Sequence, residues 1–536
     1  MKKILCVLAA LCLVQAFSYA QLPPKTDLPQ VVKSGDKYTL MVDGKPYLML
    51  GGQCGNSSNW PAVLPHVWET MKVMHANTLE IPIYWEEIEA VKGKYDFTSV
   101  QRLLDQAREH RIRLVLLWFA TWKNGSNHYM PEWMKLDSKQ YYNVVGNKGR
   151  WIDSPSPHAK AAMELDAKAF AAVMAYLKEK DPCHTVIMVQ VQNEPGTWDS
   201  VRDYAKEANA LFEKKVPKAL LEPDVLVALG ASKKAKGSWR EVFGERADEY
   251  FHAWYVARYI EYVAAAGKAE NPLPLYVNAA LRNPLTNPLA NEYESGGPTD
   301  NVIPIYKVAA PSIDFVAPDI YLQGDDQVMK VIDLYAREDN ALMVPESGNH
   351  TKYLYEVLRK GIGFAPFGVD GHGPERMAPL AAEYALLKPM ASDLAKWSAE
   401  GKVFSAIETE GHPTQQVDLG EWMADITFGP ARRNAPQPPI QKGKEQPANG
   451  KALLVKYQEG DFLVMGTNCR FSFKPIGKQA GKAWHYLRVE EGVFNEDGKW
   501  EMMRVLNGDQ TDWGGPYIGA EPSLLRIRVY SRENRE

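Results

Sequence analysis

Short apolar runs alternate with stretches of helical spacing along most of the first 370 residues. The runs, rich in Val, Ile, Leu and aromatic residues, fall at 46–55, 78–85, 113–119, 186–193, 274–280, 314–321, 341–346 and 363–368. Between them, apolar positions recur with helical spacing, as at Val100, Leu103, Leu104 and Ala107. Continuous apolar strands separated by amphipathic helices are typical of a parallel sheet covered by helices, and eight such units predict a (β/α)8 barrel. A doubly wound open sheet is the structural alternative.

The pattern changes after about residue 400, where apolar runs become shorter and turns more frequent. Runs at 453–457, 462–465, 486–489 and 525–530, with turn signals such as Asn507-Gly508 between them, predict an antiparallel β-sandwich. The proline-rich stretch 429–450 is either a linker or a long loop of that unit. We therefore expect a barrel over 21–400 and a β-rich domain over 401–536. About 80 residues separate the fourth and fifth strands, and we expect this insertion to wall a binding site.

The first 20 residues have the pattern of a secretory signal peptide. Lys2 and Lys3 precede an apolar run at 4–17, and small residues stand at 18–20 before Gln21. The run is too short to cross a membrane as a helix. Cys12 raises the alternative of a lipoprotein, but Leu11 occupies the place where lipidation needs a small residue. We expect an exported protein, periplasmic or extracellular, with no integral membrane segment in the mature chain.

Charge and cysteine content exclude several classes of protein. The chain has 62 Lys and Arg against 66 Asp and Glu, with no cluster of like charge, so nothing favours binding to the phosphates of a nucleic acid. Cys54, Cys183 and Cys469 are too few and too far apart for a metal site or a disulfide framework. We interpret them as small core residues, with one disulfide as the alternative. The 15 Trp, 26 Tyr and 16 Phe are core residues or flat platforms for sugars, and composition does not decide between these uses.

Two glutamates stand at the ends of predicted barrel strands. The fourth strand ends in Gln192-Asn193-Glu194-Pro195-Gly196, and the seventh ends in Val344-Pro345-Glu346-Ser347-Gly348. The carboxyl ends of the strands carry the catalytic residues in this fold. Two carboxyl groups suit the cleavage of a glycosidic bond, because one must protonate the leaving oxygen while the other attacks the anomeric carbon from the opposite face.

Asn-Glu-Pro at the fourth strand and Glu at the seventh resemble clan A of the glycoside hydrolases. The resemblance implies that Glu194 is the acid/base and Glu346 the nucleophile of a retaining enzyme. It also implies that Asn193 binds the sugar 2-hydroxyl and that Tyr321, at the tip of the sixth strand, contacts the nucleophile through its hydroxyl.

Within the clan, three stretches resemble glycoside hydrolase family 35, the β-galactosidases. They are 77–97, with Tyr84 and Trp85; 122–133, with Trp122-Lys123-Asn124-Gly125; and 192–194. The sequence departs from that family at Pro82 and at Phe119-Ala120-Thr121, where galactose-binding residues are common. Another clan A β-glycosidase, acting on glucosides, arabinosides or mannosides, is therefore the alternative. A non-catalytic carbohydrate-binding barrel is the alternative from another class.

The remaining candidates for contact with a sugar are residues near the predicted strand tips: Tyr84, Trp122, Trp198 and Asn278. Metal-binding, phosphate-binding, dinucleotide-binding and serine-hydrolase motifs are absent from the sequence, so we expect no metal and no cofactor. The sequence thus predicts an exported, retaining, exo-acting β-galactosidase whose partner is a carbohydrate substrate.

Overall fold

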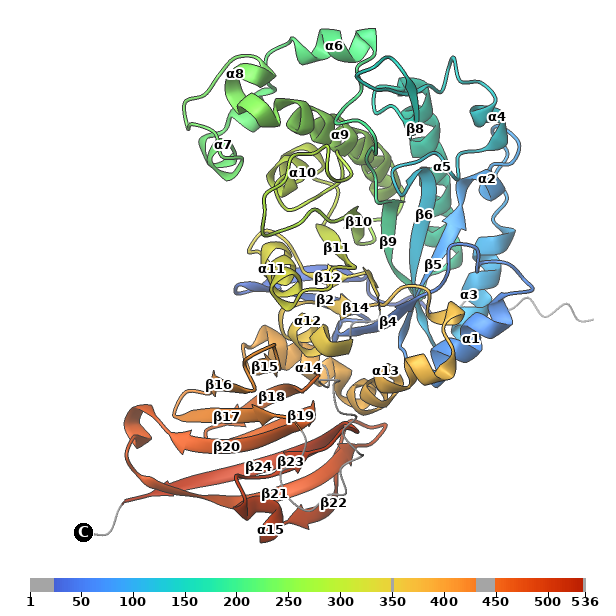
Figure 1. Ribbon diagram of the computed structural model, residues 1–536. Coiled ribbons are helices and arrows are strands. Elements are labelled where there is room, and N and C mark those ends of the chain that lie inside the picture. The colour runs from blue at the N-terminus through green and yellow to red at the C-terminus, as the bar shows by residue number, and fades with distance from the viewer. Residues whose placement is uncertain (1–23, 349–350, 430–448, 534–536) are drawn as a thin grey trace, which may run out of the picture.

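The computed structural model describes residues 24–348, 351–429 and 449–533. Its central sheet is parallel and has the strand order β12-β14-β4-β5-β6-β9-β10-β11-β13. Strands β12 and β13 are two halves of the predicted seventh strand, interrupted at Pro345, which has no N–H for a sheet ladder. Because β12 pairs with β14 and β13 pairs with β11, the sheet closes on itself (Figure 1). The predicted (β/α)8 barrel is confirmed, and the open sheet is excluded.

Each predicted run contains a barrel strand, although the first is shorter than expected. The barrel strands are β4 (Met49–Gln53), β5 (Thr78–Tyr84), β6 (Arg113–Lys123), β9 (Val186–Asn193), β10 (Leu275–Ala280), β11 (Phe315–Ile320), β12 (Met343–Val344), β13 (Glu346–Ser347) and β14 (Gly363–Phe364). In β6 the side chains alternate: Leu117 and Phe119 belong to the cluster inside the barrel, whereas Trp118 packs in the outer layer against helices.

The surrounding helices cover the outer face of the sheet. The main ones are α1 (Leu64–Val73), α3 (Thr98–His110), α5 (Lys160–Lys180), α9 (Ala247–Glu270), α10 (Ile303–Ala309), α11 (Asp325–Tyr335), α12 (Leu354–Lys360), α13 (Pro374–Leu387) and α14 (Ala391–Ala399). In α3, Val100, Leu103, Leu104 and Ala107 are all buried, which confirms the helical spacing.

A small N-terminal sheet that the sequence analysis did not predict closes one end of the barrel. It consists of β1 (Gln30–Ser34), β2 (Lys37–Val42) and β3 (Lys45–Tyr47), all antiparallel. Leu40 and Val42 of β2 pack in the same cluster as Met49, the first residue of β4. The strand tips at the other end are therefore left for a functional site.

The insertion after β9 carries three short helices, α6 (Lys206–Phe212), α7 (Pro223–Ala228) and α8 (Trp239–Phe243), at the top of Figure 1. Trp239 is buried and meets Phe251 of α9 edge to face, with 5.4 Å between ring centroids. A hairpin of β7 (Asn143–Val145) and β8 (Trp151–Pro155) adjoins the start of this insertion, since Ser154 Oγ donates to the carbonyl oxygen of Gly196 at 2.8 Å.

The C-terminal part is a β-sandwich, as predicted. One sheet has the order β15-β18-β19-β24-β21-β22 and the other β16-β17-β20-β23. Apolar side chains from both sheets, including Ile426, Phe462, Phe471 and Ile527, form a separate core between them. The strands are β15 (Val403–Ile407), β16 (Thr414–Asp418), β17 (Trp422–Phe428), β18 (Lys451–Gln458), β19 (Asp461–Thr467), β20 (Cys469–Pro475), β21 (Ala483–Phe494), β22 (Trp500–Leu506), β23 (Tyr517–Ile518) and β24 (Ser523–Arg532).

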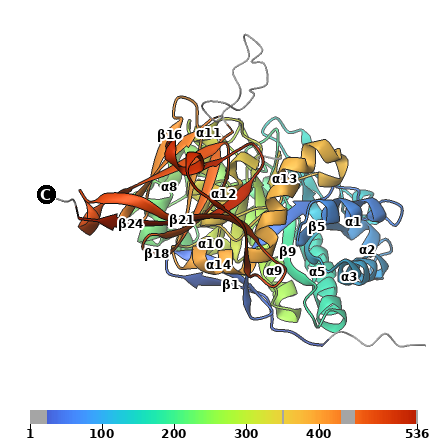
Figure 2. The same cartoon turned by 90° about the horizontal axis from the view of Figure 1, so that it is seen from below.

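The sandwich packs on the barrel beside α12 and α14, and leaves α1 and α3 to one side (Figure 2). A buried ion pair crosses this junction: Lys451 Nζ of β18 lies 2.6 Å from Glu383 Oε1 of α13. The same ammonium lies 5.1 Å from the centre of the Tyr355 ring. The two parts are thus joined by an ion pair as well as by apolar packing.

Two expectations concern residues that the structure does not describe: the signal peptide over 1–20 and most of the proline-rich stretch 429–450. Within the described ranges, no helix has both the length and the apolar character needed to cross a membrane. Cys54, Cys183 and Cys469 have free thiols, so the alternative of one disulfide is excluded.

Candidate active site

Glu346 is the most heavily hydrogen-bonded carboxyl group at the strand tips. It begins β13, directly after the break at Pro345, and is 3% exposed. Oε1 accepts hydrogen bonds from Gln53 Nε2 at 3.0 Å and from Asn193 Nδ2 at 3.1 Å. Oε2 accepts a hydrogen bond from the Tyr321 hydroxyl at 2.9 Å. Three donors thus hold the Glu346 carboxyl group in one orientation at the strand tips.

Glu194 is held in an uncommon backbone conformation. Its φ is 42° and that of Gln192 is 67°, a region that residues other than glycine rarely occupy. The turn after β6 fastens the segment: Asn124 N–H donates to the carbonyl oxygen of Asn193 at 3.2 Å, and Gly125 N–H to that of Glu194 at 2.9 Å. Such conformations persist where the surroundings over-determine them, which is common at functional sites.

The carboxyl groups of the two glutamates lie close together at the strand tips. One carboxyl oxygen from each of Glu194, Glu346 and Asp319 lies within 4.8 Å of the others. Retaining enzymes separate their two carboxyl groups by about 5 to 5.5 Å, and inverting enzymes by about 6.5 to 9.5 Å. Burial, and next the charge of Glu346, raise the pKa of Glu194 to about 7, against the opposing charge of Lys123. Glu194 therefore keeps a proton to donate near neutral pH.

Asp319 is a third carboxyl group at the site, which the sequence analysis did not single out. Its Oδ2 accepts a hydrogen bond from Asn278 Nδ2 at 2.6 Å. Burial, followed by the charges of Glu346 and Glu194, raises the pKa of Asp319 well above its usual range. A signal was present in the sequence: Asp319 lies two residues before Tyr321, so strand alternation places both on one face.

The same three carboxyl groups form the only cluster of metal-type ligands this close together among the described residues. Glu346 and Asp319 already accept hydrogen bonds from protein donors, which a cation would have to displace. The expectation that this site binds no metal stays a prediction.

Lys123 brings the positive charge to this group of acids. It ends β6, is 4% exposed, and its Nζ donates to Asn193 Oδ1 at 2.8 Å. It lies in a motif that supported the family resemblance, but neither Lys123 nor Gln53 was among the expected site residues. Their positions at strand ends were the available signal.

Glu294 is a further buried acid, on the loop that follows β10. It is 2% exposed, and the side chain of Trp198 lies beside its carboxyl group. A Cβ atom on Gly125, whose φ is +67°, would lie 2.1 Å from Glu294 Oε1, so the approach of the turn after β6 requires glycine. Burial, and next the charge of Glu194, raise the pKa of Glu294 well above its usual range. No periodicity marks this loop residue in the sequence.

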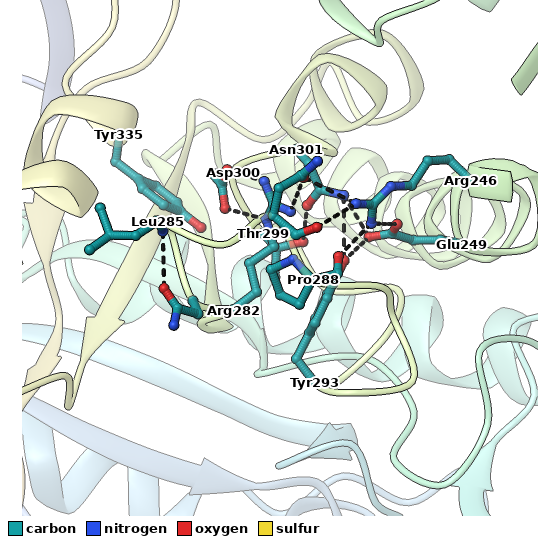
Figure 3. A network of polar contacts seen from close by, with 12 residues as sticks. Arg246, Glu249, Arg282, Leu285, Pro288, Tyr293, Thr299, Asp300, Asn301 and Tyr335 are labelled. Atoms are coloured by element: carbon teal, nitrogen blue, oxygen red, sulfur yellow. Dashed lines mark hydrogen bonds and ion pairs between the residues drawn. The ribbon is translucent and has the colours of Figure 1, made fainter. Parts of the chain in front are cut away.

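A polar network fastens the loop that carries Glu294 (Figure 3). Arg282 and Asp300, near its two ends, form a two-point ion pair with both contacts at 2.7 Å. Asn301 Nδ2 donates to Glu249 Oε1 of α9 at 2.6 Å. The Tyr335 hydroxyl donates to the carbonyl oxygen of Pro298 at 2.8 Å. The position of Glu294 is thus set by contacts on both sides of it.

The expected sugar contacts separate into two groups. Trp198 is 46% exposed and packs beside Gly125 and Glu294, so its ring is accessible near Glu194. Trp122 is fully buried in the outer layer of the barrel, edge to face with Tyr259 of α9 at 4.7 Å, and presents no surface to a ligand. Trp122 packs in the same outer cluster as Trp118, beyond a register shift between Trp118 and Lys123.

Tyr84 and Asn278 support other residues at the site. The Tyr84 ring is buried between Trp60 and Tyr129, with centroids 6.0 and 5.3 Å away, and Trp60 is the exposed ring of this stack. Asn278 Oδ1 accepts a hydrogen bond from the backbone N–H of Glu194 at 2.9 Å. Since Asn278 also binds Asp319, it holds two acids in place and is itself buried.

This arrangement can protonate one side of a bond and attack the other. Residues 56–265 match the family model described as beta-galactosidase, glycoside hydrolase family 42. The match points to family 42 in place of family 35, which corrects the family expected from the sequence motifs and keeps the clan. Residues 380–516, which cover the last barrel helices and most of the sandwich, match a domain of unknown function (DUF5597).

Individual relatives are distant. A beta-galactosidase of Xanthomonas manihotis is 24% identical over an alignment of 241 residues. The alignment covers 40% of this chain and only 38% of that relative's length. The chain also resembles the structure of a beta-galactosidase from Bacillus circulans sp. alkalophilus, with 15% identity, a TM-score of 0.46, and coverage of 65% of this chain and 57% of the other. A family 42 beta-galactosidase from G. stearothermophilus gives 15% identity, a TM-score of 0.48, and coverage of 66% and 58%.

Proposed function

We propose that this protein is a retaining, exo-acting β-galactosidase that hydrolyses terminal β-D-galactosyl residues of oligo- or polysaccharides. The observation that carries the proposal is the pair Glu194 and Glu346, with carboxyl oxygens within 4.8 Å and opposite environments. Glu346 faces three hydrogen-bond donors, whereas the pKa of Glu194 is raised to about 7 by burial and by Glu346. One group is thus suited to attack and the other to donate a proton.

The reaction would proceed in two displacements. Glu346 attacks the anomeric carbon and forms a glycosyl ester while Glu194 gives its proton to the departing glycosidic oxygen. Glu194, now a carboxylate, takes a proton from water as that water attacks the same carbon, which breaks the ester and restores both residues. The Tyr321 hydroxyl and the Asn193 amide bind the nucleophile in the resting state and are available to the sugar during the reaction.

Galactose is the sugar that the family 42 match over 56–265 supports. Glucose, arabinose and mannose are the alternatives that a substrate panel must separate. Export to the periplasm or the extracellular space is also part of the proposal, and it rests on the signal-like pattern of residues 1–20.

A panel of nitrophenyl β-glycosides that differ only in the sugar tests the proposal. Preferred hydrolysis of the β-galactoside is expected; turnover of another sugar alone would replace galactose, and turnover of none would reject the enzyme. Proton NMR of the first product should show the β-anomer, since two displacements at one carbon retain its configuration, and an α-anomer would contradict the proposal. Glu346→Gln should abolish turnover, whereas Glu109→Gln, a control on the outer surface of α3, should not.

Azide should restore turnover of an activated galactoside by the Glu194→Ala variant, because a small anion can enter the space left by the acid/base residue. The expected product is β-galactosyl azide. An unchanged rate without azide would assign the acid/base role to another residue.

A further inference from the structure

Lys123 is a buried cation whose hydrogen bond leads to the nucleophile through a single side chain. Its Nζ donates to Asn193 Oδ1 at 2.8 Å, and Asn193 Nδ2 donates to Glu346 Oε1 at 3.1 Å. An ammonium group has donors only, so the atom of Asn193 that faces it must be the carbonyl oxygen. The NH2 group is then forced to face Glu346. If the amide turned over, its oxygen would face the Glu346 carboxyl oxygen, and two acceptors would oppose each other.

We propose that Lys123 is a positioning residue, which sets the orientation of the Asn193 amide so that its N–H groups serve the nucleophile and the sugar 2-hydroxyl. The proposal rests on the proposed glycosidase function for its second part. Lys123 itself would touch neither the sugar nor the reacting atoms. Its effect would pass through Asn193.

The surroundings of Lys123 hold its ammonium group in one place. Its backbone N–H donates to the carbonyl oxygen of Ser126 at 3.0 Å, which closes the turn after β6. Its Nζ also contacts Asn124 Oδ1 and lies 5.2 Å from the centre of the Phe119 ring. The chain segment that places Lys123 is therefore the one that fastens the backbone of Asn193 and Glu194.

The charge of Lys123 also suits this place. It acts on two buried acids, Asp319 and Glu294, and on the partly buried Glu194, and lowers the pKa of each against the larger effect of burial. A buried ammonium needs compensating charge, and these acids supply it, although none of the described residues forms an ion pair with Lys123.

Asn193 has one N–H left over from its bond to Glu346. The amide nitrogen carries two hydrogens, and the structure uses one of them on Glu346 Oε1. The second is available to a hydroxyl group on the carbon next to the attacked one. A hydrogen bond at the 2-hydroxyl strengthens in the transition state, so the orientation of this amide should affect turnover more than binding.

A double-mutant cycle tests whether Lys123 acts through Asn193. The variants are Lys123→Met, Asn193→Ala and the pair, assayed on an aryl β-galactoside and on its 2-deoxy analogue. We expect Lys123→Met to lower kcat by about 10²-fold on the galactoside, because misplacement of a positioned group has effects of this size. In the N193A background, and on the 2-deoxy substrate, the same substitution should change kcat by less than about 3-fold.

Lys135→Met is the matched control for loss of a cation at this end of the barrel. Lys135, on α4 (Glu132–Lys135), forms an ion pair with Glu86 at 3.1 Å. It contacts none of Lys123, Asn193 and Glu346. Its activity should equal that of the wild type. Should Lys123→Met fail to fold, Lys123→Gln, which keeps one donor, takes its place, with a smaller loss expected in the same pattern.

Equal losses from Lys123→Met in the wild-type and N193A backgrounds, or no loss in either, would overturn the proposal and leave the glycosidase function intact. A wild-type protein inactive on every β-glycoside would reject the function instead. In that case high-resolution crystal structures of the wild type and of Lys123→Met decide the matter. The proposal requires the Asn193 amide to leave Glu346 in the variant, and an unchanged contact at about 3 Å would overturn it.

Discussion

The alkaline limit of activity should be set by Glu194. Its pKa is raised from the usual 4.5 to about 7, first by burial and next by the charge of Glu346. This difference corresponds to about 3 kcal/mol in favour of the protonated form. A general acid must be protonated to act, so activity should be present below pH 7 and lost as the pH rises through it. At pH 8 about one tenth of the enzyme would retain the proton, and at pH 9 about one hundredth.

The assay is kcat/KM against pH for two substrates that differ in their need for the proton. A β-galactosyl disaccharide has a leaving group that must be protonated, and its kcat/KM should fall about tenfold for each pH unit above 7. A 2,4-dinitrophenyl β-galactoside has a leaving group that departs as an anion, and its kcat/KM should stay level over the same range. The control thus isolates proton donation from other effects of pH on the protein.

Two results would refute this reasoning. An alkaline limb below about pH 5.5 with the disaccharide would mean that the environment of Glu194 does not hold its proton. The same limb with both substrates would mean that a different group, or the fold itself, titrates.

Three further predictions concern stability. Because folding raises the pKa of Glu194, the folded state loses stability as the pH rises from about 4.5 to 7. Glu194→Gln should therefore stabilise the protein at pH 8 by about 2 kcal/mol, a value reduced because the side chain is partly exposed to solvent, and should change nothing at pH 4. Urea unfolding at both pH values measures the difference. Glu356 is the opposite case: burial would raise its pKa, but Arg359 and Lys360 outweigh burial and lower the pKa to about 2. About 3 kcal/mol of stability that is present above pH 4.5 should therefore be lost as the pH falls towards 2. Glu356→Gln should remove this dependence of stability on acid pH. Lys451→Met leaves Glu383 unpaired at the junction and should lower the free energy of unfolding in urea by about 3 to 5 kcal/mol. The double variant Lys451→Met with Glu383→Gln should recover this loss. A loss below about 1 kcal/mol in the single variant would show that the ion pair is dispensable.

The barrel could be predicted because its signals are local. Apolar runs and helical spacing repeat along the chain, and a barrel strand lies within each predicted run, including the seventh, which breaks at Pro345. The small sheet of β1 to β3 was not predicted, since its strands are short and largely exposed except where Leu40 and Val42 enter the barrel. Their role depends on a contact with strands far along the chain.

The site residues show the same division. Glu194 and Glu346 could be predicted as a pair because both end strands that the fold brings to one face. Trp122 stands at a strand tip too, but its ring packs outward against Tyr259, beyond a register shift in the strand. Glu294 has no signal at all, because it lies on an irregular loop whose course is set by ion pairs such as Arg282 with Asp300.

The sequence by itself determined the barrel, the sandwich, and the two strands whose ends carry glutamates, because periodicity and turn residues act over a few positions. Tertiary structure alone decided how those glutamates differ. The pKa of Glu194 depends on burial and on Glu346, which lies 152 positions away in the chain, and the orientation of Asn193 depends on Lys123, 70 positions before it. Charge and hydrogen bonding act over a few ångströms of space, and only the closed barrel brings these residues that near to one another.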